Sequence, residues 1–351
     1  MGRGPLSLLA ALSLMLGGCG GPRWTGPESD HFDGRRFHNP GVSFDKGLTD
    51  VLRYLMARDP GDWQALEAQP GPPPIRRAGA GELVVTPINH ASVLIQADGL
   101  NLLTDPIWSK RASPLGWAGP ARYRPPGIRF EDLPPIDAVL ISHNHYDHMD
   151  LPTLRRLVDR DDPLIFVPLG DAQLLRKLNS QRIHELDWGQ SAELPNGRRV
   201  WGQRCVHWSG RFGTLDRNAS LWLAYLVETD QGPVYFGGDT GYGDHFQQTR
   251  DQFGPVRLAL LPIGAYEPRW LVGVQHINPA EAVRAHQVLQ AQHSIGIHYG
   301  TFELSDVGQS QPPADLAEAL EAANLPPERF RAAEYGQATV FERQLQKDSS
   351  P

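Results

Sequence analysis

The stretch "ISHNHYDHMD", residues Ile141–Asp150, holds three histidines and two aspartates within ten residues. Its first two residues end the apolar run "AVLIS" at 138–142, which has the length and composition of a short buried strand. Core packing does not require so many titratable groups, whereas loops at strand ends in α/β proteins commonly carry functional residues. The stretch therefore predicts a chemical site between this strand and a helix that begins near Leu151.

The spacing inside this stretch is that of metal ligands. His143 and His145 are two residues apart, so in extended backbone both imidazoles point the same way and reach one ion. Asp147 and His148 follow where the chain turns into the helix, which lets them reach a second ion close to the first. The alternative is a group of unrelated surface or core histidines, and the density of the cluster argues against it.

Donors of the same kind end three later predicted strands, "RVWGQRCVH", "PVYFGGD" and "HSIGIH". Imidazole and carboxylate donors suit zinc, which accepts both. With the first cluster they make seven candidate metal ligands: His143, His145, Asp147, His148, His207, Asp239 and His298.

The remaining pattern predicts an α/β (α+β) fold. Strands are expected at "ELVVTPI", "SVLIQADGLNLLTDP", "LIFVP", "LWLAYLVE" and "RLALLPIG". Helices are expected near 48–58, at "LPTLRRLVDR", "DAQLLRKLN" and "NPAEAVRAHQVLQ", and within Pro313–Ala323. Strands outnumber helices in the first half and alternate with them in the second, which favours sheets covered by helices on their outer faces.

Composition limits the partners. The chain has 351 residues, 40% of them hydrophobic, which is enough for a sizeable core in one large domain or two ordinary ones. A net charge of -7 without a Lys/Arg cluster argues against nucleic acid. Partners are expected to be small, lipid or peptide-like.

The N-terminus has the layout of a bacterial export signal, in which Arg3 precedes the apolar run "LSLLAALSLML". That run is too short to span a bilayer as a stable helix. "LGGCG" resembles the lipobox of bacterial lipoproteins, so residues 1–18 are expected to be removed and Cys19 lipidated, with an ordinary secretory signal as the alternative. Cys205 would then be the only other cysteine, and no intramolecular disulfide could form.

Six strings together resemble the N-acylphosphatidylethanolamine-hydrolysing phospholipase D family of the metallo-β-lactamase superfamily. They are "HASVLIQADGLNLLTDPIWSKRASPLGWAGPARYR", "ISHNHYDHMD", "FGGDTGY", "LPIGAYEPRW", "QHINPAEAV" and "IHYGTFEL". The similarity runs from about Phe37 to about Glu342. The H-x-H-x-D-H motif alone marks only the superfamily, while the tyrosine in "HYDH" and the "GAYEPRW" string are narrower. The resemblance implies a four-layer αββα sandwich, the metallo-β-lactamase fold.

The resemblance also implies roles for particular residues. One zinc would be held by His143, His145 and His207, the second by Asp147, His148 and His298, with Asp239 bridging them. Asp147 and Asp239 would then be catalytic, and Tyr146 and His276 would contact the substrate. A hydroxide bridging two zinc ions would hydrolyse N-acylphosphatidylethanolamine to N-acylethanolamine and phosphatidic acid.

The "PGPPP" at 70–74 cannot be a helix or a central strand, so the compact domain is expected to start near Gly81. The expected layout is a signal peptide (1–18), a lipidated tether and N-terminal arm (19–80), the hydrolase domain (81–345) and a tail (346–351). A phospholipid substrate, a membrane reached through lipidated Cys19 and a homodimer are the expected partners. The expected location is the bacterial cell envelope, facing the periplasm or the exterior.

Two alternative functions stay open. The export signal and the strings "HWSGR" and "PRWLVGVQH" depart from the animal family members, so an envelope hydrolase of the same fold acting on another phosphodiester, a lactone, an amide or a thioester is the second reading. The third is a lipoprotein that binds zinc or lipid without turnover. Structural zinc sites are usually closed by four ligands, which argues against the third reading.

Several residues have two interpretations at this stage. Asp105 either orients a metal-ligating histidine or forms an Asp-Pro turn. Glu267, Arg269 and Trp270 either line the pocket, or Arg269 only pairs with Glu267. Cys205 is expected to be a buried small hydrophobe, and "WSGRFGTLDRN" a mobile loop over the site. Histidines without the clustering are interpreted as structural or surface residues: His31, His38, His90, His184, His245, His286 and His293.

Overall fold

The computed structural model of the chain describes residues 24–44, 46–213 and 215–341. The expected signal peptide, lipidated Cys19 and tail 346–351 lie outside these residues, so those predictions stay predictions. Among the described residues, no helix is both long and apolar enough to cross a membrane.

The first sheet has seven strands in the order β14-β1-β2-β3-β4-β5-β6. Strands β1 to β3 form an antiparallel meander, and β3 to β6 run parallel to one another. The β2–β3 turn places Asp98 and Gly99 at φ of 49° and 78°, which is the conformation that Asp-Gly favours in tight hairpins. The strands are β1 (Leu83–Asn89), β2 (Ser92–Ala97), β3 (Leu100–Thr104), β4 (Ala138–Leu140), β5 (Leu164–Pro168), β6 (Ile183–Leu186) and β14 (Thr339–Phe341).

The second sheet also has seven strands, in the order β13-β12-β11-β10-β9-β8-β7. Strands β7 to β10 pair antiparallel, and strands β10 to β13 pair parallel. All five residues of β11 are buried, as expected for a strand covered on both faces. The strands are β7 (Ser191–Glu193), β8 (Arg199–Gln203), β9 (Ala224–Val227), β10 (Val234–Phe236), β11 (Leu258–Pro262), β12 (His293–Ile297) and β13 (Phe330–Ala332).

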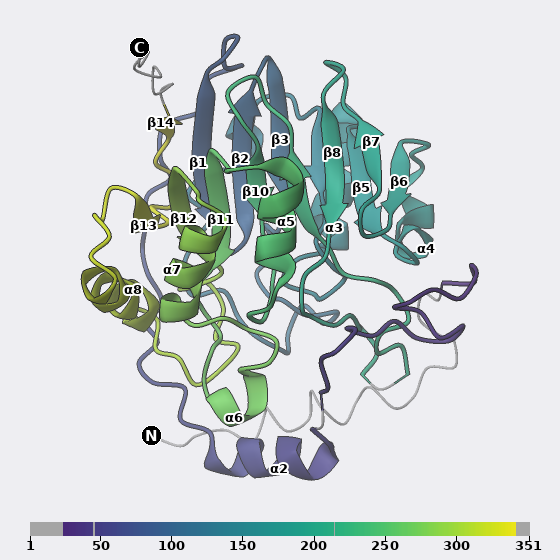
Figure 1. Cartoon of the computed structure of the whole chain (residues 1–351), viewed down its shortest axis with the longest axis vertical. Coiled ribbons are helices and arrows are strands. Elements are labelled where there is room, and N and C mark those ends of the chain that lie inside the picture. The colour runs from purple at the N-terminus through teal and green to yellow at the C-terminus, as the bar shows by residue number, and fades with distance from the viewer. Residues whose placement is uncertain (1–23, 45, 214, 342–351) are drawn as a thin grey trace.

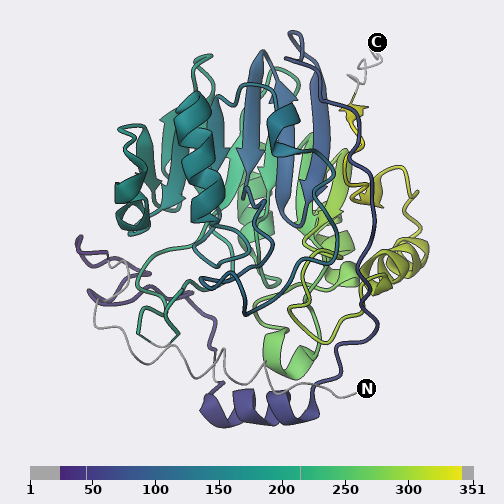
Figure 2. The same ribbon diagram turned by 180° about the vertical axis from the view of Figure 1, so that it is seen from behind.

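Helices cover the outer faces of both sheets (Figures 1 and 2). The first sheet is covered by α3 (Leu151–Asp161) and α4 (Ala172–Leu175), which continues into a 3-10 turn. The second is covered by α5 (His245–Phe253), α7 (Pro279–Val288) and α8 (Gln311–Ala322). The order helix, sheet, sheet, helix confirms the predicted αββα sandwich. Two further helices, α2 (Leu48–Ala57) and α6 (Arg269–Val272), lie at the lower end in both views.

The alternation of side chains along each strand produces two hydrophobic cores. On β2, Val93 and Ile95 face the second sheet, whereas Leu94 packs in the core beneath α3 with Val139 and Leu157. The core between the sheets is the larger and contains residues of both.

The carboxyl ends of the central strands meet at one edge. Strands β1, β3 and β4 point the same way in the first sheet, and β8, β10, β11 and β12 do so in the second. The loops that follow them lie at the lower edge in Figures 1 and 2. Side chains carried by these loops can therefore meet in one site at this edge of the sandwich.

The N-terminal arm is irregular, as predicted, but it is packed against the body. Phe32 and Phe37 are 1% and 2% exposed and belong to the core between the sheets. The boundary at residue 81 therefore marks where regular strands begin and not where core packing begins.

Candidate metal centre

The loop after β4 carries the first group of donors. It turns sharply, because the backbone N–H groups of His148 and Met149 both bond the carbonyl of His145, and α3 begins at Leu151. His143 and His148 are almost fully buried. The loop after β4 thus holds its histidines in the protein interior at the edge of the sheet.

One cluster consists of His143, His145 and His207. His143 Nε2 lies 2.7 Å from His145 Nδ1, and His207 Nε2 lies 3.4 Å from the same atom. His207 was expected to end a strand, but β8 stops at Gln203 and His207 follows in irregular backbone. Its Nδ1 lies 3.1 Å from the carbonyl oxygen of Gln275, which points Nε2 toward the cluster.

The second cluster gathers around Asp147. Asp147 Oδ2 lies 3.2 Å from His148 Nε2 and 3.4 Å from His298 Nε2. His90 joins them, with Nε2 at 2.8 Å from the same oxygen. All four can hold a metal ion together, since their donor atoms lie within 4.8 Å of one another.

Asp239 lies between the two clusters. Its Oδ2 is 3.0 Å from His298 Nε2 and 3.4 Å from His148 Nε2, both in the second cluster. The same oxygen is 3.8 Å from His207 Nε2 in the first cluster. One carboxylate is therefore in reach of both groups of histidines.

Asp105 contacts the ligand loop. These contacts support the interpretation that it orients a metal-ligating histidine. Its Oδ2 lies 2.6 Å from His148 Nδ1, and its Oδ1 accepts the backbone N–H of Ser142 at 2.7 Å. The Ser142 hydroxyl in turn lies 2.9 Å from His143 Nδ1. These contacts occupy the far nitrogens of the two histidines and turn Nε2 of each toward the centre.

The electrostatics suit cation binding. Burial lowers the pKa of His145 and of His207 to about 3, so both are neutral near pH 7, the form that binds metals. Burial opposes ionisation of Asp239, but His298 and His148 outweigh it and hold the pKa of the carboxyl well below its usual range. Burial also opposes charge on His298, whereas Asp239 and Asp147 raise its pKa to about 9, so a cation would have to displace that proton.

The donor atoms themselves fit a metal. Buried polar atoms normally find a hydrogen-bond partner. Here several buried donor atoms make no hydrogen bond of regular geometry among the described residues: His148 Nε2, Asp239 Oδ1, His276 Nδ1 and His298 Nε2. The described donors form four overlapping groups that could each hold an ion. The seven predicted ligands are thus brought together at one buried site that fits metal.

The two expected substrate contacts both lie beside this site. His276 Nδ1 is 3.8 Å from Asp239 Oδ2, and its ring centre is 5.2 Å from that of His207. Tyr146 is half-buried. Its hydroxyl donates to the carbonyl of Arg211 at 3.2 Å, and the Arg211 guanidinium lies 3.8 Å from its ring centre.

The stretch 267–270 does not show the Glu267–Arg269 pair that was one of its two interpretations. The Arg269 side chain pairs with Glu281, at 2.9 Å, and donates to the carbonyl of His276 at 2.8 Å. The Glu267 carboxylate accepts the backbone N–H of Arg269 at 2.8 Å and does not pair with the guanidinium, so the expected side-chain pair was wrong. Trp270 is partly exposed beneath Arg53 of α2. Arg269 therefore fixes the loop that carries His276.

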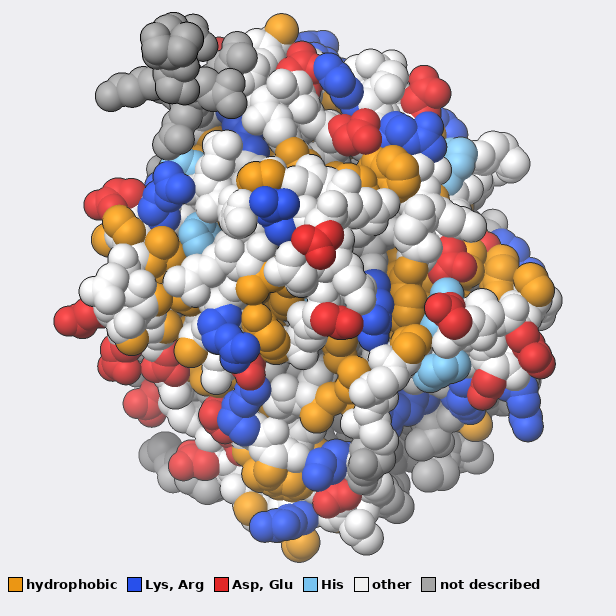
Figure 3. Space-filling model, viewed as in Figure 1, with side chains coloured by type: hydrophobic (Ala, Val, Ile, Leu, Met, Phe, Trp, Pro, Cys, Tyr) orange, Lys and Arg blue, Asp and Glu red, His pale blue; other side chains and the backbone are white. Residues whose placement is uncertain are grey.

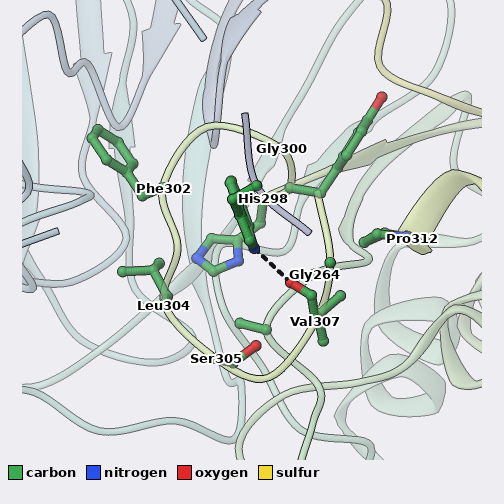
Figure 4. A pocket seen from close by; sticks show the side chains of 12 residues that line it. Gly264, His298, Gly300, Phe302, Leu304, Ser305, Val307 and Pro312 are labelled. Carbon is green, nitrogen blue, oxygen red and sulfur yellow. Dashed lines mark hydrogen bonds between the residues drawn. The ribbon is translucent and has the colours of Figure 1, made fainter. Parts of the chain in front are cut away.

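A pocket beside the centre is lined by His298 and by Phe302, Leu304, Val307 and Pro312 (Figure 4). Trp63 closes it and donates to the carbonyl of Val307 at 3.0 Å. Its volume of about 260 Å³ includes space open to solvent, which places it below the range of about 300–1,000 Å³ usual for ligand pockets. We therefore do not assign it to the substrate.

His90 was interpreted from the sequence as a structural or surface residue, but it is buried and belongs to the second cluster. The available clue was its place directly after β1, whose carboxyl end lies at the same edge as that of β4. His31, His245 and His286 are buried away from the centre, His293 is half-buried, and His38 and His184 are exposed.

Two smaller expectations can be compared with the structure. Cys205 is buried, as predicted. The loop after His207 was expected to be mobile, but its first half is anchored: Gly210 donates to Asn144 Oδ1 at 2.7 Å and Arg211 to the Asn144 carbonyl at 2.8 Å.

Comparison with known proteins places the site in a family. A family model described as a Beta-lactamase superfamily domain matches residues 100–299. An N-acyl-phosphatidylethanolamine-hydrolyzing phospholipase D of Caenorhabditis elegans is 36% identical over 317 residues, covering 83% of this chain and 88% of the nematode protein. An uncharacterized protein of Mycobacterium tuberculosis is 40% identical over 283 residues, covering 78% of this chain and 74% of that protein.

Solved structures share the fold at lower identity. An isothiocyanate hydrolase from Delia radicum gut bacteria has a TM-score of 0.60 at 19% identity, over 74% of this chain and 99% of that one. A metallo hydrolase from Ignicoccus hospitalis has a TM-score of 0.57 at 22% identity, over 75% of this chain and 100% of that one.

Proposed function

The chain belongs to the metallo-β-lactamase superfamily and, within it, to the N-acylphosphatidylethanolamine-hydrolysing phospholipase D family, and from this premise we propose its substrate. It is a metal-dependent hydrolase. We propose that it cleaves the phosphodiester of N-acylphosphatidylethanolamine and releases N-acylethanolamine and phosphatidic acid.

The position of Asp239 carries this proposal. One carboxylate oxygen within 3.0–3.8 Å of histidines from both clusters suits a two-metal centre, which is an arrangement used in phosphodiester hydrolysis. In this assignment His143, His145 and His207 would hold one zinc ion. Asp147, His148 and His298 would hold the other, and Asp239 would serve both.

When bound, the two zinc ions supply positive charge for the phosphodiester oxygens and lower the pKa of water at the site. The chain's own residues position the reactants. Asp147 and Asp239 provide fixed negative charge, and Asp105 keeps His148 in one orientation. In the overall reaction water adds to phosphorus, the bond from phosphorus to the ethanolamine oxygen breaks, and a proton from water passes to that oxygen.

His276 and Tyr146 are assigned to the substrate. Burial lowers the pKa of His276 to about 3, so its neutral imidazole is available for hydrogen bonding to a phosphoryl oxygen. The hydroxyl of Tyr146 donates to the carbonyl of Arg211, and the Arg211 guanidinium lies over one face of the ring. The contact assigned to the substrate is therefore made by the part of the ring that Arg211 does not cover.

A membrane is the proposed setting. The outer face of α2 exposes Leu52 and Met56, at 49% and 83%, and Arg53 and Lys46 lie over Trp270 beside it. In Figure 3 hydrophobic and basic side chains lie together at this lower end. Apolar groups flanked by cations suit an anionic lipid surface.

The proposed anchor is a lipid on Cys19, which would hold the protein at the membrane of a bacterial envelope. The mass of the N-terminal peptide of membrane-extracted protein tests it. A lipid-modified cysteine supports the anchor, and a peptide that still begins at Met1 contradicts it.

Product analysis tests the reaction itself. Purified, zinc-loaded protein is incubated with mixed phospholipids containing N-acylphosphatidylethanolamine, beside a His145→Ala control, and products are identified by mass spectrometry. Release of N-acylethanolamine and phosphatidic acid by the unmutated protein alone is expected. Intact lipids with both zinc sites filled would contradict the substrate and favour another substrate for the same fold.

A further inference from the structure

The N-terminal arm, residues 24–44, runs alongside the segment that carries the metal ligand His207. Phe37 exchanges two hydrogen bonds with Asn218: its N–H donates to the Asn218 carbonyl at 2.8 Å, and Asn218 Nδ2 donates to the Phe37 carbonyl at 3.0 Å. Arg204 donates to the carbonyl of Pro40 at 2.8 Å. The arm, purple in Figures 1 and 2, is thus bonded to the chain on both sides of His207.

The arm is held in this place by a buried histidine. His31 Nε2 lies 2.8 Å from Asp187 Oδ1, its Nδ1 lies 2.6 Å from Asp30 Oδ1, and its ring stacks on Trp188 at 4.4 Å. With the burial of Phe32 and Phe37, these contacts make the arm a fixed part of the body.

Asn39 is the arm residue that bonds the metal ligand directly, and it is 3% exposed. Its Nδ2 donates to the carbonyl of His207 at 2.8 Å. Its Oδ1 accepts from the indole N–H of Trp222 at 3.1 Å, and that N–H also lies 3.2 Å from the carbonyl of Cys205. Both ends of the amide are therefore used, and they join the backbone at His207 to a fully buried tryptophan.

The backbone at His207 depends on such contacts because it lies beyond the end of β8, where no strand ladder is described. Val206 is held from the other side by Thr240 and Gly241. The Asn39 amide completes the support by bonding the carbonyl of the ligand residue itself. Outer residues that orient a ligand typically change metal affinity by about 10–100-fold when replaced.

We propose that Asn39 is a positioning residue for His207, and that the N-terminal arm is thereby part of the His143–His145–His207 zinc site. Asn39 does not touch the centre and acts through the backbone of one ligand. In the Asp147–His148–His298 cluster, His148 is oriented by Asp105 and not by Asn39. The inference rests on the metal centre of the proposed function but not on its lipid substrate.

This role of Asn39 is tested by measuring the zinc affinities of the full chain, as the wild type and as Asn39→Ala. The affinities are obtained by competition with a chromophoric chelator. The matched control is Asn101→Ala. Asn101 is also a buried amide that donates to two backbone carbonyls, at 2.7 and 3.0 Å, but it lies near the start of β3, away from the centre. Near-UV circular dichroism checks folding, and the isosteric Asn39→Asp replaces Asn39→Ala if the alanine variant is unfolded.

We expect Asn39→Ala to bind one zinc ion about 10–100-fold more weakly and the other with wild-type affinity. Asn101→Ala should lower thermal stability while leaving both affinities within about twofold, on the same reasoning. Unchanged affinities in the Asn39 variant, equal loss at both sites, or the same loss in the control would each overturn the inference. A wild type that binds no zinc would overturn the proposed function as well, which distinguishes the two failures.

Discussion

Asp239 lies where the segments that follow β8, β10 and β12 of the second sheet meet the ligand loop of the first. It follows β10 by three residues, and its Oδ2 is shared among His148, His207, His276 and His298 at 3.0–3.8 Å. Residues that share contacts in this way act as a unit, so removing the charge of Asp239 should change the electrostatics of all four histidines.

Asp239→Asn keeps the size of the side chain but removes its charge and one oxygen donor. We expect hydrolysis to fall by at least about 100-fold, because a direct ligand should matter no less than an outer one. Turnover of a phosphodiester and the metal content per chain are the measurements.

Asp244→Asn is the control for this prediction. Asp244 follows on the same loop, with a side chain that is 71% exposed, and its replacement should leave turnover unchanged. Full activity in Asp239→Asn would rule out the bridging assignment, whereas near-UV circular dichroism should show that both variants are folded.

Among the elements, α2 has an unusual position. It is joined to the body at its end by Arg58, which pairs with Glu303 at 2.9 Å, while its outer face leaves Leu52 and Met56 exposed. In Figure 1 it lies at the same end of the molecule as the loops of the metal centre. A membrane bound there would meet the site directly.

We expect the double change Leu52→Ser and Met56→Ser to weaken binding to anionic phospholipid vesicles by about tenfold or more, because burying each apolar side chain contributes about 1.5–3 kcal/mol. Vesicle co-sedimentation measures the binding. Turnover of a short-chain soluble phosphodiester should be unchanged.

Val340→Ser is the matched control, since Val340 is 59% exposed on β14, near the opposite end of the molecule. Equal vesicle binding by the α2 variant and the wild type would contradict the role given to α2. An equal loss in the control would show that the effect is not specific to this face.

The elements with strong periodicity were predicted closely. The α7 start was expected at Asn278 or Pro279, and it begins at Pro279 with Asn278 as its cap, bonded to the backbone N–H of Glu281 at 2.8 Å. The last helix begins at Gln311, two residues before its predicted range. The short strands β6, β7, β13 and β14 went unpredicted, because three or four residues outside a longer apolar run carry too little pattern.

At the scale of the whole molecule, the metal centre joins the two sheets. The donors of the loop after β4 belong to the first sheet, whereas His207, Asp239 and His298 follow strands of the second. The backbone N–H of His298 also bonds the carbonyl of His90 at 2.8 Å across the same boundary. Ions held there would be cross-links between halves of the fold.

Removing zinc should therefore lower the melting temperature by several degrees or more. A ligand that binds only the folded state stabilises it by about 2.7 kcal/mol at a free concentration 100 times its Kd. Calorimetry of chelated and zinc-restored protein measures this. A melting temperature that does not depend on zinc would contradict the cross-linking role, and His145→Ala should show a smaller zinc effect than the wild type.

The sequence by itself determined the fold class and predicted seven candidate donors. Four of the seven lie within the H-x-H-x-D-H spacing and the other three at the ends of predicted strands, so both inferences rest on patterns of neighbouring residues. The chemistry of His, Asp and a buried strand end needs no long-range information.

Only the tertiary structure decided which distant residues complete the site. His90 joins the second cluster because β1 is parallel to β4, and Asn39 reaches His207 across 168 positions because the arm packs between Asp187 and Asn218. Arg269 pairs with Glu281 and not with its neighbour Glu267. Strand order and the path of an irregular arm arise from packing of the whole chain, which no short stretch of residues specifies.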